Sequence, residues 1–319
     1  MSLNSSINGH VNYLMENYTI IEKIGEGTFG VVLKAKRKAD GKVVALKKIR
    51  IRKQEYEDFP KNVIREAKSL QHVNHNNVLR LYEVFVNGSS LVLSLEYMKT
   101  DLAKIIKSQK TPFQESHIKC IMLMLLKGLN NCHTNNIMHR DIKPANLLFN
   151  SLGELKLGDF GLATLYLGND QSYSHQVATR WYRAPELLYG SRSYNYKVDI
   201  WAAGCVMAEL YNLSPLFTGE NDIDQLYKVL TLLGVPSETT WPGVSKLPDF
   251  GKITFSKVKV RALSELIPNA PEIAIDLMTH LLQFDASKRY SAQEALRHPY
   301  FFTSPLPADY SELNISGKC

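Results

Sequence analysis

The stretch that decides the fold reads His139-Arg140-Asp141-Ile142-Lys143-Pro144-Ala145-Asn146 and is followed by Asp159-Phe160-Gly161. Asp141 can accept a proton from a hydroxyl nucleophile, and Lys143 can neutralise charge on a phosphate that is being transferred. Asn146 and Asp159 offer the hard oxygen ligands that Mg²⁺ prefers. A lone His-Arg-Asp would also fit a polar loop between strands, whereas the full pattern with its Asp-Phe-Gly is far more specific. It predicts phosphoryl transfer, with Asp141, Lys143 and Asn146 as catalytic residues and Asn146 and Asp159 as metal ligands.

Length and composition describe an ordinary globular protein. The chain has 319 residues, enough for about two domains of ~100–200 residues each. Its net charge of +7 is modest, and no run of Arg or Lys is interleaved with aromatic residues, so we expect no nucleic-acid partner. The longest apolar run, 121–126, is too short to cross a bilayer, so we expect no membrane span.

The four cysteines predict a reducing compartment. They form no Cys-x-x-Cys pair, and none lies at zinc-site spacing with histidines. Free cysteines in apolar patterns are typical of intracellular proteins. We therefore expect the cytoplasm or the nucleus.

Hydrophobic periodicity divides the chain into a strand-rich part and a helical part. Five β-type runs are predicted at 18–24, 31–36, 43–49, 79–86 and 91–97, and Asp40-Gly41 predicts a hairpin between the second and third. A helix at 61–70 interrupts them, with Val63, Ala67 and Leu70 on one face. Further helices are predicted at 116–133, 198–211, 222–233, 271–284 and 292–298. We expect an N-terminal extension at 1–17, a small lobe at 18–96, a larger lobe at 97–302 and a tail at 303–319 that wraps the surface or frays.

A glycine-rich loop, 25–30, lies between the first two predicted strands. Dinucleotide-binding proteins use the same Gly-x-Gly-x-x-Gly spacing, but there the last glycine opens a helix. Here Val31-Val32-Leu33 continues as strand sequence, and no Gly-Lys-Ser/Thr follows as in a Walker loop. The pattern predicts a hairpin whose backbone approaches phosphates closely, because glycine has no Cβ.

Lys47 and Glu66 are predicted to pair across the cleft. Lys47 closes the apolar strand Val43-Val44-Ala45-Leu46, at the position of a lysine that contacts α- and β-phosphates. Glu66 borders the apolar stripe of the 61–70 helix, from which its carboxylate can hold Lys47 in place. A solvated surface lysine and glutamate are the alternative interpretation.

Together these motifs resemble the eukaryotic protein kinase family, and the resemblance covers residues 18–302. Ala184-Pro185-Glu186, Asp199 to Gly204 and Arg289 complete the resemblance. It implies an α+β, two-lobed kinase fold, with a small antiparallel β-sheet lobe carrying one key helix and a larger, mostly helical lobe, and with ATP and Mg²⁺ in the cleft. Lys143, two residues after Asp141, is similar to serine/threonine kinases.

Residues 59–66 and 177–186 resemble the cyclin-dependent group, and residues 301–307 its cell-cycle-related kinase branch. The resemblance implies a cyclin-like activating subunit, substrates with proline after Ser or Thr, and cilia as a further location. The resemblance to this branch implies that the chain is a regulatory kinase of the cell cycle or cilia.

The resemblance also assigns site residues. The implied ATP-binding set is Ile24, Gly25, Glu26, Gly27, Thr28, Phe29, Gly30, Val32, Ala45, Lys47, Glu66, Leu95, Glu96, Met98, Leu148 and Asp159. The implied pocket for the residue after the phosphorylated one (the +1 pocket) is Val177, Thr179 and Arg183. Leu95 takes the gatekeeper position, where a smaller side chain than Phe leaves room behind the adenine.

Two departures from the family pattern concern regulation. Phe29 stands where many relatives have an inhibitory tyrosine, whereas Thr28 keeps a hydroxyl. Ser174 aligns with the activating threonine, but only Arg65 and Arg140 remain of three pocket arginines, because position 164 is Thr. We expect a weaker dependence on Ser174 phosphorylation than is normal for the family, or another means of ordering the loop.

Two other interpretations remain open. A pseudokinase scaffold would lack Lys47, Asp141 or Asp159, and all three are present. A chain that is inactive until a partner docks on the 61–70 helix remains compatible with the motifs.

Overall fold

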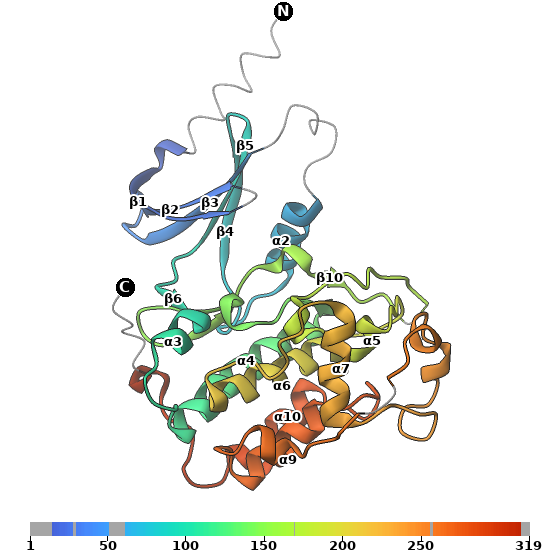
Figure 1. Ribbon diagram of the computed structural model, residues 1–319. Helices are drawn as coiled ribbons and strands as arrows, with labels where there is room; N and C mark the ends of the chain where they lie inside the picture. The colour runs from blue at the N-terminus through green and yellow to red at the C-terminus, as the bar shows by residue number, and fades with distance from the viewer. Residues whose placement is uncertain (1–14, 28–29, 51–60, 169, 256–257, 314–319) are drawn as a thin grey trace, which may run out of the picture.

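The computed structural model describes residues 15–27, 30–50, 61–168, 170–255 and 258–313. They form a small sheet lobe above a larger helical lobe (Figure 1). This confirms the predicted fold class. Thr28 and Phe29 of the glycine-rich loop lie outside the described residues.

The small lobe is a five-stranded antiparallel sheet with strand order β1-β2-β3-β5-β4. Its strands are β1 (Tyr18–Gly27), β2 (Gly30–Arg37), β3 (Val43–Arg50), β4 (Leu81–Asn87) and β5 (Ser90–Glu96). The predicted hairpin joins β2 to β3: Gly41 has φ +70°, and its amide donates to the Arg37 carbonyl at 2.8 Å.

Helix α2 (Lys61–His72) packs against the sheet lobe through one apolar stripe. Val63, Ala67 and Leu70 are buried, as their spacing predicts. Glu66 lies on the same side and is only 3% exposed. The helix therefore carries a carboxylate into the region between the lobes.

The large lobe is built around two long helices. Its helices are α3 (Leu102–Ser108), α4 (Glu115–Thr134), α5 (Pro185–Leu188), α6 (Lys197–Asn212), α7 (Asp222–Leu233), α8 (Leu263–Leu266), α9 (Glu272–Leu281) and α10 (Ala292–Leu296). Helix α6 is buried on all sides except at its two ends, with Trp201 fully buried, so it forms the centre of the lobe. No described helix is both long and apolar enough to cross a lipid bilayer.

Short strands and 3₁₀ turns connect these helices, and some of them hold the predicted catalytic residues. The strands are β6 (Thr100–Asp101), β7 (Ile137–Met138), β8 (Leu147–Phe149), β9 (Leu155–Leu157) and β10 (Thr164–Leu165). The turns are η2 (Pro144–Asn146), η3 (Phe160–Leu162), η4 (Arg180–Tyr182), η5 (Val244–Lys246), η6 (Phe250–Lys252), η7 (Pro299–Phe301) and η8 (Tyr310–Glu312). Strands β6, β8 and β9 form one sheet, and β7 and β10 form another.

Several predicted boundaries were wrong. Helix α9 ends at Leu281 rather than 284, since Leu282 leaves the helical region (ψ +57°) while Phe284 stays buried against Trp241. Helix α10 ends at Leu296 rather than 298, because the following Pro299 favours an extended residue before it. Helix α3 had no range of its own in the prediction, although Asp101 caps it through a 2.9 Å bond from the Lys104 amide.

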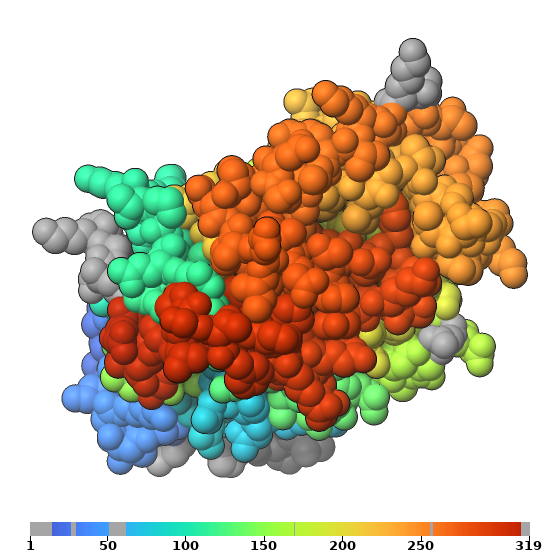
Figure 2. Space-filling model, turned by 90° about the horizontal axis from the view of Figure 1, so that it is seen from below, coloured from blue at the N-terminus to red at the C-terminus, as the bar shows by residue number. Residues whose placement is uncertain are grey.

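The described part of the tail wraps the large lobe. Lys119 of α4 is fully buried and donates to the backbone carbonyls of Thr303 and Pro305 at 3.0 and 2.8 Å. The amide of Ala308 donates to the Ser116 carbonyl at 3.0 Å. Figure 2 shows this tail in dark red along the underside of the molecule, beside the green segment that contains α3.

Candidate active site

A cavity of about 430 Å³ lies between the two lobes. Six of its lining residues were predicted site residues: Gly30, Val32, Lys47, Glu66, Asp141 and Asp159. The other five were not predicted as site residues, although Gly161 belongs to the Asp-Phe-Gly motif and two more to the 59–66 segment: Ile49, Asn62, Val63, Gly161 and Leu162. The cavity thus brings together residues from strands, helix α2 and both loops that the sequence singled out.

The cavity contains an ion pair between Lys47 and Glu66. Lys47 Nζ lies 2.8 and 2.7 Å from the two Glu66 carboxylate oxygens. Burial raises the pKa of Glu66, and the attraction of Lys47 opposes this rise. Lys47 Nζ also lies 4.0 Å from Asp159 Oδ1. The lysine ammonium is therefore held at one end of the cavity, between two carboxylates.

The second strand of the glycine-rich hairpin contributes Gly30 and Val32 to the lining of the cavity. A Cβ at Gly30 would lie 2.0 Å from the Lys48 carbonyl oxygen, so only glycine fits beside β3. Gly27 pairs with Gly30, and Gly25 with Val32, across the β1–β2 ladder. Ile24 is exposed, and Glu26 is paired with Lys23 at the surface. The last two side chains do not line the cavity.

The predicted adenine-side residues cluster at the junction of the lobes, outside the lining of the cavity. Ala45 and Leu95 are buried partners in the β3–β5 ladder. Glu96 donates its amide to the Arg80 carbonyl at 2.9 Å, and its carboxylate lies 3.4 Å from Lys156 Nζ. Met98 and Leu148 are partly buried against the same core. Because the Glu96 amide is already bonded, the backbone group of Glu96 that could contact an adenine ring is its carbonyl.

Asp141 is held from several sides. Its Oδ2 accepts hydrogen bonds from Lys143 Nζ at 2.8 Å and from Asn146 Nδ2 at 2.9 Å. Its Oδ1 accepts from the amide and the hydroxyl of Thr179, both at 3.0 Å. Burial alone would raise the pKa of Asp141, but the bond and charge of Lys143, with His139 and Thr179, hold that pKa below its ordinary value. Asp141 is therefore ionised at neutral pH and can accept a proton.

The metal ligands predicted from the sequence fit a hard divalent cation. Both hydrogen bonds of the Asn146 side chain use its amide nitrogen, so they do not occupy its carbonyl oxygen. Asp159 is half-exposed and borders the cavity. An amide oxygen and a carboxylate beside a cavity that can admit phosphates are donors of the type that Mg²⁺ takes.

Buried Asp199, from α6, holds the catalytic loop (residues 139–146). Its carboxylate accepts from the amides of His139 and Arg140 at 2.9 and 2.7 Å and lies 3.0 Å from His133 Nε2. Burial opposes the ionisation of Asp199, yet these partners lower its pKa below the usual range. Asp199 was recognised only as part of a motif, not as a site residue.

The residues after Asp159 are packed inward. Asp159 has φ +57°, a strained conformation for a residue with a side chain. Phe160 is fully buried and meets the His139 ring edge-on at 4.7 Å. Turn η3 packs against α2. This packing links the position of Asp159 to helix α2 and hence to Glu66.

The predicted regulatory residues are only partly brought together. Arg65 is exposed on α2, and Ser174 is exposed on the activation segment (residues 159–186). Arg140 is buried and donates from Nε to the Leu162 carbonyl at 2.8 Å and from Nη1 to the Tyr194 hydroxyl at 2.9 Å. Thr164, where the family has its third arginine, pairs with Met138 in the β10–β7 ladder. The involvement of Tyr194 had no signal in the sequence.

The predicted +1 pocket is organised by Arg183. Its Nε donates to the Val177 carbonyl and its Nη2 to the Ala178 carbonyl, both at 3.0 Å. Ala178 has φ +64°, which turns the backbone at this point. Asp222 at the start of α7 accepts from Arg183 Nη1 at 2.9 Å and from Arg180 Nε at 2.9 Å. Asp222 was not predicted, because a carboxylate in a helix's first turn is common.

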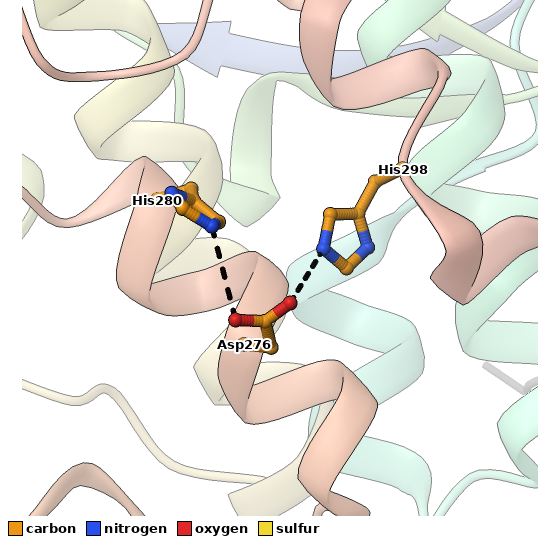
Figure 3. Close-up of side chains that lie close together, drawn as sticks. All are labelled: Asp276, His280 and His298. Atoms are coloured by element: carbon orange, nitrogen blue, oxygen red, sulfur yellow. Dashed lines mark hydrogen bonds and ion pairs between the residues drawn. The ribbon is translucent and has the colours of Figure 1, made fainter.

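A second cluster, on the far side of the large lobe, contains Asp276, His280 and His298 (Figure 3). His298 Nε2 lies 2.9 Å from Asp276 Oδ2, and His280 Nε2 lies 3.8 Å from Oδ1. His298 Nδ1 accepts from the Tyr300 amide at 3.1 Å, so Nε2 carries the proton and donates to Asp276. A metal on Nε2 would need the other tautomer and would break the Tyr300 bond. In this cluster Asp276 of α9 accepts a hydrogen bond from His298 at the start of η7, and His280 lies beside them within ion-pair distance.

Comparisons with known proteins match nearly the whole chain. A family model described as protein kinase domain matches residues 18–301. Cyclin-dependent kinase 20 of Danio rerio is 51% identical over 303 residues, which cover 94% of this chain and 88% of the relative. Cyclin-dependent kinase 20 of Homo sapiens is 48% identical over 303 residues, with 94% and 87% covered.

Two solved structures share the arrangement of both lobes. One is a chain of the CAK complex from Chaetomium thermophilum bound to ATP-gamma-S, with a TM-score of 0.89, 35% identity and 98% of each chain covered. The other belongs to the yeast RNA Pol II CTD kinase CTDK-1 complex, with a TM-score of 0.84, 35% identity, and 92% of this chain and 95% of that chain covered.

Proposed function

We propose that this chain, which belongs to the protein kinase family and to its cyclin-dependent group, phosphorylates Ser or Thr followed by proline. The kinases of this group are ATP-dependent serine/threonine kinases. The proposal rests on the backbone carbonyls at Val177 and Ala178, which already accept hydrogen bonds. Arg183 occupies the carbonyls of both Val177 and Ala178. The +1 pocket is thus short of backbone acceptors.

A substrate residue at +1 normally brings a backbone N–H into this pocket. An N–H that loses water without finding an acceptor costs about 1–3 kcal/mol. Proline has no N–H and escapes this cost. Each 1.4 kcal/mol is a factor of ten, so a preference for proline of roughly 10- to 100-fold in kcat/KM is expected.

Three peptides that differ only at +1 test this reasoning. They carry proline, alanine or N-methylalanine after the acceptor serine, and kcat/KM is measured for each. N-methylalanine lacks the N–H but has no ring, so it should recover most of the proline value. Equal rates with proline and alanine would contradict the proposal, and a low rate with N-methylalanine would show that ring shape rather than the missing N–H is read.

We propose one task in transfer for each of these polar residues of the cleft, and their contacts support it. Asp141, ionised and held by Thr179 and Asn146, orients the acceptor hydroxyl and takes its proton. Lys143 lies 2.8 Å from that carboxylate and neutralises charge on the transferred group. Lys47, fixed by Glu66, holds the α- and β-phosphates.

We propose Mg²⁺ as the metal, held by Asn146 and Asp159. When bound, it would supply positive charge that offsets the negative charge of the phosphates. Asp159 is already placed near Lys47, so its carboxylate can serve the metal and stay beside the phosphate-binding lysine. Loss of magnesium-dependent nucleotide binding in Asp159→Asn, measured by calorimetry, is the expected result. Unchanged dependence on magnesium would contradict the assignment.

We also propose a cyclin-type activating subunit that docks on α2. The relatives of this chain are named cyclin-dependent kinases. Helix α2 is the element that carries Glu66 into the cleft. Titrating activity with cyclin-type subunits tests this proposal, because a partner that stabilises α2 should raise kcat. Full activity of the isolated chain would favour an autonomous kinase. No transfer with any subunit, despite ATP binding, would favour a scaffold.

For location we propose the cytoplasm or nucleus, with the cilium as a further site. The support is the resemblance of residues 301–307 to the cell-cycle-related branch. Imaging of the tagged full-length chain in ciliated cells tests it, and exclusion from cilia would remove that part of the proposal.

A further inference from the structure

Tyr194 lies between the catalytic loop and the activation segment, 6% exposed. Its hydroxyl accepts from Arg140 Nη1 at 2.9 Å and donates to the backbone carbonyl of Ser174 at 2.5 Å. One neutral hydroxyl therefore joins the catalytic loop to the activation segment at the predicted phosphorylation site.

The residue beside Ser174 strengthens this connection. Tyr173 is buried, and its ring centroid lies 5.4 Å from that of Tyr194. Its amide donates to the Arg192 carbonyl at 2.7 Å, and its hydroxyl accepts from the Leu167 amide at 2.8 Å. The backbone at 173–174 is thus attached to the large lobe through two neighbouring residues.

Arg140 keeps its charge available in this arrangement. Its two side-chain hydrogen bonds end on neutral oxygens, those of Leu162 and Tyr194, and within the described ranges no carboxylate forms an ion pair with it. Burial raises the pKa of Tyr194 against the opposing effect of Arg140, so the hydroxyl stays protonated at neutral pH and can donate to Ser174.

The same segment continues into the substrate platform. Three residues after Ser174, the Val177 carbonyl is bound by Arg183, and Thr179 bonds directly to Asp141. A segment fixed at Thr179 and at Ser174 holds the +1 pocket between two anchors. Loss of the Ser174 anchor should disturb peptide binding more than nucleotide binding.

We propose that Tyr194 is a positioning residue that orders the activation segment independently of phosphate, so that phosphorylation of Ser174 adds to this order and does not create it. The hydroxyl takes over part of what a phosphate bound by arginines would do. This inference deepens the proposed function, because it concerns the regulation of the same site.

The test compares Tyr194→Phe with the unaltered chain, each with serine or phosphoserine incorporated at position 174. Tyr194→Phe keeps the ring and removes only the hydroxyl. The proteins are purified as complexes with their co-purifying subunits, and kcat/KM for a peptide and KM for ATP are measured. The acceptor peptide carries whichever +1 residue the unaltered chain prefers, so a failure of the proline proposal leaves this comparison intact.

In the unaltered chain, phosphoserine should raise kcat/KM by about threefold or less. Tyr194→Phe with serine should lose roughly tenfold, the size of one hydrogen bond with a charged partner, and phosphoserine should then restore about tenfold. KM for ATP should stay within about twofold. This coupling between position 194 and the phosphate is what a merely structural tyrosine would not produce.

Tyr211→Phe is the matched control. It also removes a buried hydroxyl from the large lobe, one that lies 2.8 Å from the Tyr300 hydroxyl and far along the chain from Ser174. Its response to phosphoserine should equal that of the unaltered chain. The same phosphoserine factor in Tyr194→Phe and Tyr211→Phe would overturn the inference, as would a phosphoserine effect of a hundredfold in the unaltered chain.

Discussion

The catalytic loop and the activation segment meet where Asp141 bonds to Thr179, but they are held by different kinds of contact. The loop is fixed from behind by a buried carboxylate, Asp199, which accepts two backbone amides. The segment is held by a tyrosine hydroxyl at Ser174 and an arginine at its backbone carbonyls. The buried bonds to Asp199 are charge-assisted and strong, whereas the bond from the Tyr194 hydroxyl to the Ser174 carbonyl joins two neutral groups, is worth less and is easier to replace. Chemistry should therefore depend on the loop, and regulation on the segment.

The largest effect is expected from Asp141→Asn. The amide keeps the size of the side chain but cannot accept the proton, so kcat should fall by roughly 10³-fold or more. Binding of ATP should stay within about threefold, because Lys47, Glu66 and Asp159 are untouched. Single-turnover transfer and nucleotide titration measure the two quantities. Persistent turnover would show that Asp141 is not the base.

Asp199→Asn should lower the stability of the folded protein. An amide nitrogen would face a backbone N–H that now has a carboxylate partner, so the free energy of unfolding should fall by about 3 kcal/mol. Urea unfolding measures it. Asp276→Asn is the control, since that carboxylate also accepts from a histidine but is 61% exposed, and its loss should cost less than about 1 kcal/mol. Equal losses would mean that burial does not distinguish the two sites.

As the pH is lowered, Glu66 should be protonated before Asp141, and the Lys47–Glu66 ion pair should then be lost. The pKa of Glu66 is raised by burial, and that of Asp141 is lowered by Lys143 and its other partners. Both groups act as carboxylates, so each function is present above its pKa and is lost as the pH falls through it. The acidic limb of kcat/KM should therefore lie above the range of an ordinary glutamate and belong to Glu66.

Glu66→Gln provides the check on that assignment. It should lower kcat/KM for ATP by roughly 10- to 100-fold at neutral pH, because a neutral amide holds the Lys47 ammonium less tightly. The acidic limb should then move to lower pH. An unchanged limb would assign the titration to another group.

How far the sequence reached depends on the kind of contact. Strand and helix periodicity placed Lys47 at the end of an apolar strand and Glu66 beside a buried helix stripe. That the two pair was implied by the kinase motif pattern. The roles of Tyr194 and Asp222 could not be predicted from the sequence. Tyr194 contacts the Ser174 carbonyl and Arg140, and Asp222 contacts Arg183 and Arg180, and distant parts of the chain bring these partners together. The positive φ of Ala178 also escaped, since alanine carries no signal for it.

The smallest effect, and the most direct test of the contrast between loop and segment, is that of Ser174→Ala. The variant keeps the backbone carbonyl that Tyr194 binds and removes only the side-chain hydroxyl, with any phosphate that it carries. With the activating partner present, kcat/KM for the preferred peptide should fall by about threefold or less, under ~0.7 kcal/mol. A fall of several hundredfold would show that the phosphate, and not the neutral hydroxyl of Tyr194, orders the activation segment.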